Sequence, residues 1–150
     1  DGNAKMVDIS EKNNTDRIAI ASGFIELNKE TIQLVKTGVL KKGDVLTVSK
    51  IAAIQASKKT SSLIPLCHNI NLNKIDIEFN INTQENKIYC KSTVSSSGKT
   101  GVEMEALTSV SIALLTIYDM CKASDKNMII SEIKLLEKHG GKSGSWVLKN

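Results

Sequence analysis

The sequence predicts an α+β fold, a ferredoxin-like βαββαβ sandwich with an antiparallel sheet and an extra short helix. Three observations favour it: strand-like and helix-like stretches follow one another in that order, two alternating stretches form a central hairpin, and the longest helix is apolar on nearly every side. The 150 residues, 41% hydrophobic and 24% charged, are typical of a globular protein with a sizeable core. With one proline and no repeat or linker, we expect a single domain over residues 1–150.

The first half of the chain predicts one strand and two helices. Residues 17–27 alternate well enough for a strand, and residues 28–37 form the extra short helix, which Gly38 closes. A longer helix begins after Asp44, a good N-cap residue, and reaches about Lys58. Its apolar positions predict a buried stripe formed by Val45, Val48, Ile51, Ala52 and Ile54.

The second half predicts a hairpin, the longest helix and a last strand. Residues 75–81 and 88–94 alternate apolar and polar around a short polar turn, which indicates an antiparallel pair with one polar face. Residues 102–122 form the long helix, and because residues 110–115 are apolar nearly all round, we expect this helix deep in the core or in a subunit interface. Residues 128–136 supply the last strand.

The basic residues are unevenly divided. The net charge is +4, yet nineteen lysines stand against one arginine, Arg17. Proteins that read nucleic acid bases rely on arginine forks and aromatic platforms, and aromatic residues make up only 3% of this chain. The charge therefore does not by itself predict a nucleic-acid partner, and an AT-rich genome, which favours Lys, Ile and Asn together, explains the imbalance equally well.

Cysteine usage and hydropathy suggest a reducing compartment and no membrane partner. Cys67, Cys90 and Cys121 are odd in number, far apart and without a Cys-x-x-Cys pair, so neither a disulfide framework nor a cysteine zinc site is predicted. We expect no apolar run close to the roughly 18 residues of a membrane span, and no signal peptide is visible. The chain begins at Asp1 without a methionine, which leaves open a removed targeting segment.

Two glycine loops are candidates for anion binding. Residues 98–101 and 140–144 each hold a Gly-Lys-Thr or Gly-Lys-Ser element, but neither has the earlier glycine of a Walker motif. Glycine lets successive backbone N–H groups face one concavity, so either loop could hold an anion. The alternative for the first loop is a turn with a helix cap, and the alternative for the second is a disordered tail.

Further candidates for chemistry are a Cys-His pair and two lysines. Cys67 and His68 follow Pro65 and suggest metal ligation or a thiol nucleophile, but neighbours in an extended chain point in opposite directions, so a structural histidine is the simpler interpretation. Lys41 and Lys42 precede a helix N-terminus, whose positive potential would lower a lysine pKa and assist proton transfer; the alternative is a solvated turn.

The long helix carries charge at both ends. Asp119 and Lys122 are spaced i, i+3 and share a face, so that they could act as a tuned pair or form an ordinary ion pair. Glu105 lies 14 residues before Asp119, which is about 21 Å along a helix. A small ligand cannot touch both ends, so if both belong to active sites, either the ligand is long or two chains contribute opposite ends to one site.

Seven blocks of the chain, taken in order, resemble the cyclic pyranopterin monophosphate synthases, the molybdenum cofactor biosynthesis protein C family. The most specific are Gly-Val-Glu-Met-Glu-Ala-Leu at 101–107 and Thr-Ile-Tyr-Asp-Met-Cys-Lys at 116–122; the others are at 5–8, 42–45, 51–56, 63–68 and 140–144. The resemblance covers essentially the whole chain. The chain departs from the family at Ala53, Asn69 and His139, where glycine, proline and serine are usual.

This resemblance implies a lyase that converts 3′,8-cyclo-7,8-dihydro-GTP to cyclic pyranopterin monophosphate and releases pyrophosphate. It implies one catalytic domain, a nucleotide-derived triphosphate substrate, and a homo-hexamer, a trimer of dimers, with sites at subunit interfaces. No nucleic acid and no membrane are expected as partners. The location would be cytoplasmic in a bacterium, or an organelle in a eukaryote.

By matching position, the resemblance also assigns residues. The general acid/base lysines would be Lys42 and Lys122, with Asp119 as the carboxylate beside the second. The substrate pocket would be lined by Leu66, Cys67, His68, Glu103, Met104 and Glu105. Arg17, Lys138 and Lys142 would contact phosphates or neighbouring polar groups. No metal site and no tightly bound cofactor are expected, although Mg²⁺ could accompany the triphosphate.

Two other functions compete with this lyase. A ferredoxin-like RNA-binding module would fit the fold and the charge, but its sheet would need exposed aromatic residues and the hairpin offers only Phe79 and Tyr89. A thiol or metal hydrolase would be built on Cys67 and His68.

Overall fold

The computed structural model describes residues 2–150 and confirms the ferredoxin-like prediction. In chain order, the strands are β1 (Thr15–Glu26), β2 (Lys74–Asn82), β3 (Lys87–Gly98), β4 (Ile129–His139) and β5 (Trp146–Val147). The helices are α1 (Lys29–Thr37), α2 (Val45–Lys58), α3 (Thr60–Leu63) and α4 (Glu103–Cys121).

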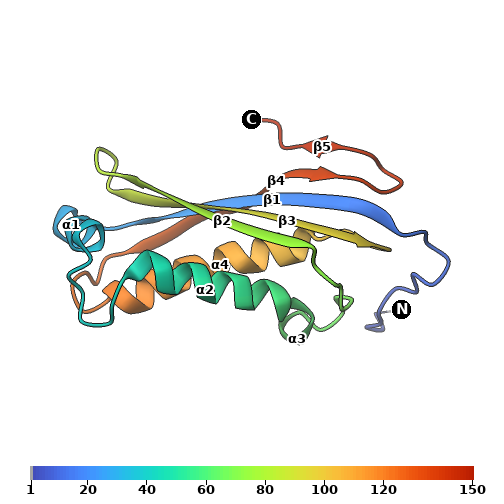
Figure 1. Ribbon diagram of the computed structural model, residues 1–150, viewed down its shortest axis with the longest axis horizontal. Helices are drawn as coiled ribbons and strands as arrows, with labels where there is room; N and C mark the ends of the chain where they lie inside the picture. Colours follow the sequence, from blue (N-terminus) through green and yellow to red (C-terminus); the bar gives the residue numbers. More distant parts are fainter. Residues whose placement is uncertain (1) are drawn as a thin grey trace.

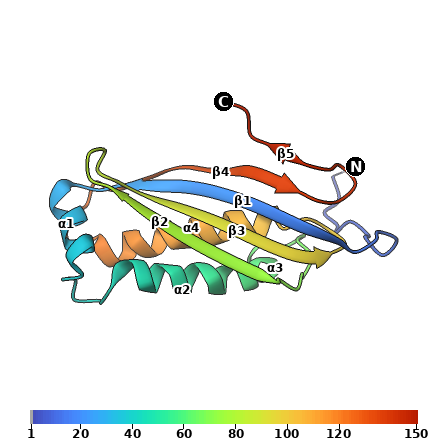
Figure 2. The same ribbon diagram turned by 45° about the horizontal axis from the view of Figure 1, so that its top comes forward.

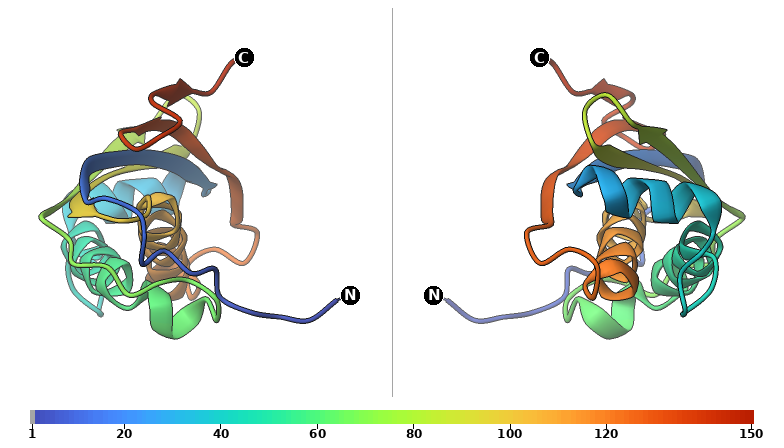
Figure 3. Two further views of the ribbon diagram at one scale, coloured as in Figure 1. Left: turned by 90° about the vertical axis from the view of Figure 1, so that its right-hand side faces the viewer. Right: turned by 90° about the vertical axis from the view of Figure 1, so that its left-hand side faces the viewer.

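One antiparallel sheet organises the molecule. Its strand order is β2-β3-β1-β4-β5, so that β3 separates β1 from β2 and β1 separates β3 from β4, as in the split βαβ pattern. Both α2 and α4 lie against the same face of this sheet, and they run along much of its length (Figures 1 and 2). The end-on views show the helices below the sheet and the C-terminal segment above it (Figure 3).

The core lies between the sheet and α4. Strand residues that point toward the helices, such as Ile25, Ile88 and Val94, are fully buried, and so are Val110 and Leu114 on α4. The alternation of the hairpin strands thus places every second residue in this layer. The prediction that the long helix is a core element is confirmed on this face.

The length and hydropathy of α4 require a correction. The helix has a mean hydropathy of 1.3 over an 18-residue window and is long and apolar enough to cross a membrane, contrary to the expectation that no run approaches that length. However, 56% of that window is buried inside the fold. A core helix of a globular protein meets the same criterion, because it too is apolar on nearly every side.

The predicted ends of α1 are confirmed. The Asn28 side chain accepts a hydrogen bond from the Thr31 backbone N–H at 2.8 Å, which caps the N-terminus. Gly38 ends the helix with φ 72°, a left-handed conformation that favours glycine.

The buried stripe predicted for α2 is confirmed for Val45 and in part for Ile54, which packs against the core, and is wrong for Val48 and Ile51. Val45 is buried, but Val48 is exposed and 53% of Ile51 is accessible. The helix instead turns small residues inward, chiefly Ser49 and Ala53, which let it approach α4 closely. Large apolar side chains are therefore left on the outer face of α2.

Two short elements were not predicted. The α3 turn follows α2 directly, and β5 pairs with the end of β4 through Glu137↔Val147 and Lys138↔Trp146. This second hairpin extends β4 three residues beyond the predicted end at 136 and brings residues 140–144 back over the edge of β1.

Candidate active site

The first cluster of functional side chains lies at the C-terminal end of α4. The Asp119 carboxylate accepts from Lys122 Nζ at 3.0 Å and from Lys42 Nζ at 3.1 Å, and Lys42 Nζ also donates to the Asp119 backbone carbonyl at 3.2 Å. These bonds, chiefly the one from Lys122, hold the pKa of Asp119 below its ordinary value. The pair expected between Asp119 and Lys122 is therefore present, and Lys42 joins it.

The surroundings of Lys42 differ from those expected from the sequence. The residue precedes α2, as predicted, but its ammonium points to a carboxylate and a helix C-terminal carbonyl instead of standing alone at a helix N-terminus. The three groups are about half exposed. They form an open acid–base cluster that a substrate from outside could reach.

The other predicted residues gather at the opposite end of α4, around two adjoining cavities. The larger has a volume of about 610 Å³ and the smaller about 540 Å³. Both are bordered by Lys12, Thr100, Gly101 and Glu103. Because they share these residues, the two cavities adjoin one another, and we refer to them as the larger and the smaller lobe of the site.

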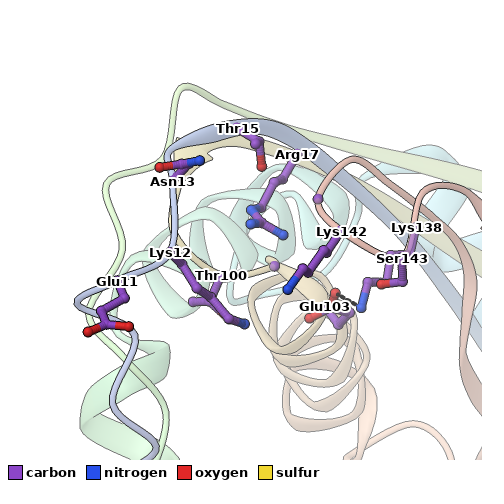
Figure 4. Close-up of a pocket in the computed structure, with 12 residues that line it drawn as sticks. Glu11, Lys12, Asn13, Thr15, Arg17, Thr100, Glu103, Lys138, Lys142 and Ser143 are labelled. Atoms are coloured by element: carbon purple, nitrogen blue, oxygen red, sulfur yellow. Dashed lines mark ion pairs between the residues drawn. The ribbon is translucent and has the colours of Figure 1, made fainter.

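The larger lobe is strongly cationic. Figure 4 shows the charged ends of Lys12, Arg17 and Lys142 turned toward the same space. Lys138 Nζ lies beside them, paired with the Glu103 carboxylate at 3.0 Å. Four cationic and two acidic residues thus line this lobe, and a group carrying several negative charges would compensate the excess of positive charge.

Both glycine loops border this cationic lobe. Gly101 belongs to the loop before α4, while Gly141 and Lys142 belong to the loop after β4. Arg17 Nε donates to the Gly98 carbonyl at 3.0 Å, which fixes the guanidinium between the two loops. The loops proposed from sequence as anion sites therefore converge on one place, although they are 40 residues apart.

The smaller lobe is less polar, and a buried acid lies behind one of its lining residues. Leu66, Cys67, His68 and Met104 line this lobe. Glu105 lies behind Cys67 and is only 3% exposed, and Cys67 Sγ donates to its Oε2 at 4.0 Å. Burial raises the pKa of Glu105, and burial together with Glu105 and Glu103 raises the pKa of Cys67. A reactive thiolate needs the reverse, so Cys67 is a poor candidate for a nucleophile.

The segment before β1 contributes residues that sequence reasoning missed. The Val7 carbonyl accepts from His68 Nε2 at 2.6 Å, and the Ser10 carbonyl accepts from Lys99 Nζ at 3.2 Å. These two contacts hold the segment over the junction of the lobes and bring Lys12 into both. The only available signal was the block at residues 5–8, which the resemblance covered without assigning a role.

The structure therefore brings the predicted residues together in two groups, not one. Lys42, Asp119 and Lys122 stand at one end of α4, and all the others stand at its beginning, about 21 Å away by the helical rise. Among residues 2–150, no three His, Cys, Asp or Glu side chains are placed so that they could hold a metal ion.

Comparisons with known proteins identify a family for this chain. A family model described as MoaC family matches residues 6–141. Over 145 residues the chain is 55% identical to a cyclic pyranopterin monophosphate synthase of Clostridium perfringens (strain 13 / Type A), covering 97% of this chain and 92% of the relative. Over 146 residues it is 51% identical to the enzyme of that name from Heliobacterium modesticaldum (strain ATCC 51547 / Ice1), with the same two coverages.

Among solved structures, the ferredoxin protease FusC in complex with Arabidopsis ferredoxin matches at a TM-score of 0.35 and 7% identity, covering 73% of this chain and 10% of that one. This likeness is too weak to bear on fold or function. None of the comparisons favours an RNA-binding module.

Proposed function

The chain belongs to the MoaC family, and we propose that it is a lyase of molybdenum cofactor biosynthesis that forms cyclic pyranopterin monophosphate. Its substrate would be 3′,8-cyclo-7,8-dihydro-GTP, and its second product pyrophosphate. Residues 1–150 would act as one catalytic domain. The two relatives named above are bacterial, so the proposal places the reaction in a bacterial cytoplasm; they lend no support to an organelle.

The observation that carries this proposal is the cationic lobe between the two glycine loops. A triphosphate brings several negative charges, and Arg17, Lys138 and Lys142 stand where these charges would be compensated. Lys12 adds a fourth cation to the set predicted from sequence. In this arrangement the base and sugar of the nucleotide would occupy the smaller lobe, against Leu66, Cys67 and Met104.

The reaction needs groups that exchange protons and groups that hold charge. Opening the guanine ring and closing a pterin ring moves several protons at nitrogen and oxygen, for which Lys42 and Lys122 are suited, with Asp119 orienting both. A ribose hydroxyl then attacks the α-phosphorus, and the bond to the β-phosphate oxygen breaks. The cations of the larger lobe would neutralise the charge that develops on the departing pyrophosphate.

The distance between the two groups supports a site shared between chains. In one chain the acid–base cluster and the cavity stand at opposite ends of α4. The outer faces of α2 and α4 also carry accessible apolar side chains, Val48, Ile51 and Leu115 among them. We propose that a second copy covers this face in a homo-hexamer, a trimer of dimers, and brings its Lys42, Asp119 and Lys122 to the cavity of the first.

Mg²⁺ would enter with the substrate. Hard oxygen ligands suit this ion, and the carboxylates that face the larger lobe are Glu11 and Glu103, the second of which is paired with Lys138. These residues do not fit a protein-built magnesium site, so phosphate oxygens and water would supply most of its ligands.

The direct test is pyrophosphate release from the cyclised substrate. The purified protein should release pyrophosphate and form cyclic pyranopterin monophosphate, and Lys42→Ala or Lys122→Ala should largely abolish both. Lys36→Ala, on the exposed side of α1, is a matched control that should leave the rate unchanged. Normal turnover in both site variants would contradict the assignment of their roles.

A further inference from the structure

His139 is a residue that no proposed role has yet used. It is the last residue of β4 and lies immediately before the loop of residues 140–144. Its ring reaches both sides of that loop: Nε2 lies 3.0 Å from Glu137 Oε1, and Nδ1 lies 2.9 Å from Ser145 Oγ. The ring thus connects the strand that enters the loop with the residue at which the chain leaves it.

The chemistry of the two partners allows this bridge in either charge state of the ring. A carboxylate accepts, so Nε2 donates to Glu137. A serine hydroxyl can donate or accept, so Ser145 satisfies Nδ1 whether that nitrogen carries a hydrogen or not. Both ring nitrogens therefore keep a partner in the neutral and in the charged imidazole.

The loop closed by this bridge is docked tightly on β1. A side chain at Gly140 would collide with the Asp16 carbonyl, and one at Gly141 would collide with the Arg17 guanidinium. Both glycines also have positive φ, 95° and 81°, which favours glycine. The backbone at these two positions therefore lies close to Asp16 and Arg17 of β1. The next residue, Lys142, lines the cationic lobe.

We propose that His139 is a positioning residue for the phosphate lobe. By tying Ser145 to the end of β4, it fixes the loop so that Lys142 and Arg17 converge on one polyanionic group. The inference rests on the proposed function for the identity of that group, a nucleotide triphosphate. It predicts that loss of the bridge weakens phosphate binding and leaves the proton transfers assigned to Lys42 and Lys122 unchanged.

Two isosteric variants separate the two contacts. The amide of His139→Asn stands near the Nδ1 position and can keep the bond to Ser145, whereas that of His139→Gln stands near the Nε2 position and can keep only the bond to Glu137. Ser145→Ala removes the bridge from the other side. We would measure kcat and KM, the dissociation constant of inorganic tripolyphosphate, and hydrogen exchange of the 140–144 amides in the full chain.

His139→Gln and Ser145→Ala should raise KM and the tripolyphosphate dissociation constant about three- to tenfold, the loss of about one hydrogen bond. Because the same cations would hold the departing pyrophosphate, kcat should fall by no more than the same factor. Exchange at 140–144 should accelerate in both, and His139→Asn should stay close to the parent protein. Unchanged constants and exchange in His139→Gln, or a parent protein that does not bind tripolyphosphate, would overturn the proposal. If the parent binds tripolyphosphate but releases no pyrophosphate, the proposed function fails, and the binding and exchange data still decide the role of His139.

Discussion

A site shared between two chains predicts that two inactive variants restore each other. His68→Ala damages the cavity at the start of α4, and Lys122→Ala damages the cluster at its end. Glu105 lies near the first of these ends and Asp119 near the second, and they are separated by about 21 Å along the helix. If each site takes one end from each of two chains, random mixing of equal amounts leaves both ends intact in about a quarter of the sites.

The assay is pyrophosphate release by hetero-oligomers that are formed by co-expression and purified through two different tags. Each variant alone should be nearly inactive, and the mixture should recover about a quarter of the parent activity. As a control, the parent chain mixed with the double variant His68→Ala/Lys122→Ala should also give about a quarter for shared sites, but about a half if one chain supplies both ends. A mixture no more active than its two components would refute the shared site.

Three further predictions concern the cavity. Because burial raises the pKa of Glu105 above its ordinary 4.5, the folded form binds the proton more tightly, so stability should fall as pH rises from about 4.5 through the raised value; urea unfolding should show that Glu105→Gln removes this loss. Gly101→Ala should keep the melting temperature but displace the Glu103 carboxylate from Lys138, and kinetics should then show a raised KM. Lys12→Gln should weaken tripolyphosphate binding several-fold and reduce the salt dependence of this binding, whereas Lys12→Arg should keep the affinity and the salt dependence of the parent. Calorimetry at two salt concentrations would measure both; equal affinities of Lys12→Gln and the parent at both concentrations would show that Lys12 has no role.

The parts of the fold that depend on local pattern could be predicted from the sequence. The hairpin alternation set which strand residues face α4, and Asn28 and Gly38 marked both ends of α1. The inner face of α2 could not be predicted in this way, because packing against α4 selected small residues such as Ser49 over large apolar ones such as Ile51. Side-chain size decided the orientation of this helix, and the periodicity of hydropathy along the sequence does not predict that orientation.

The site shows the same division. The Asp119 and Lys122 pair follows from helical spacing alone. Lys42 reaches Asp119 across 77 residues, and the resemblance assigned a catalytic role to each without placing them in contact. The position of Lys12 depends on how the segment before β1 folds back over the cavity. The contact between His139 and Ser145 depends on how the β4–β5 hairpin folds back. Neither residue spacing nor secondary-structure propensity predicts these two arrangements.

The contact between Val7 and His68 determines which ring nitrogen of His68 carries the hydrogen. A carbonyl oxygen has no hydrogen to give, so the short bond to Nε2 requires that this nitrogen carry one. When the ring is neutral, its lone pair must then lie on Nδ1. In the neutral ring His68 is thus held in a single tautomer by a backbone carbonyl, and Nδ1 is the nitrogen that remains to accept a hydrogen bond from a ligand in the smaller lobe.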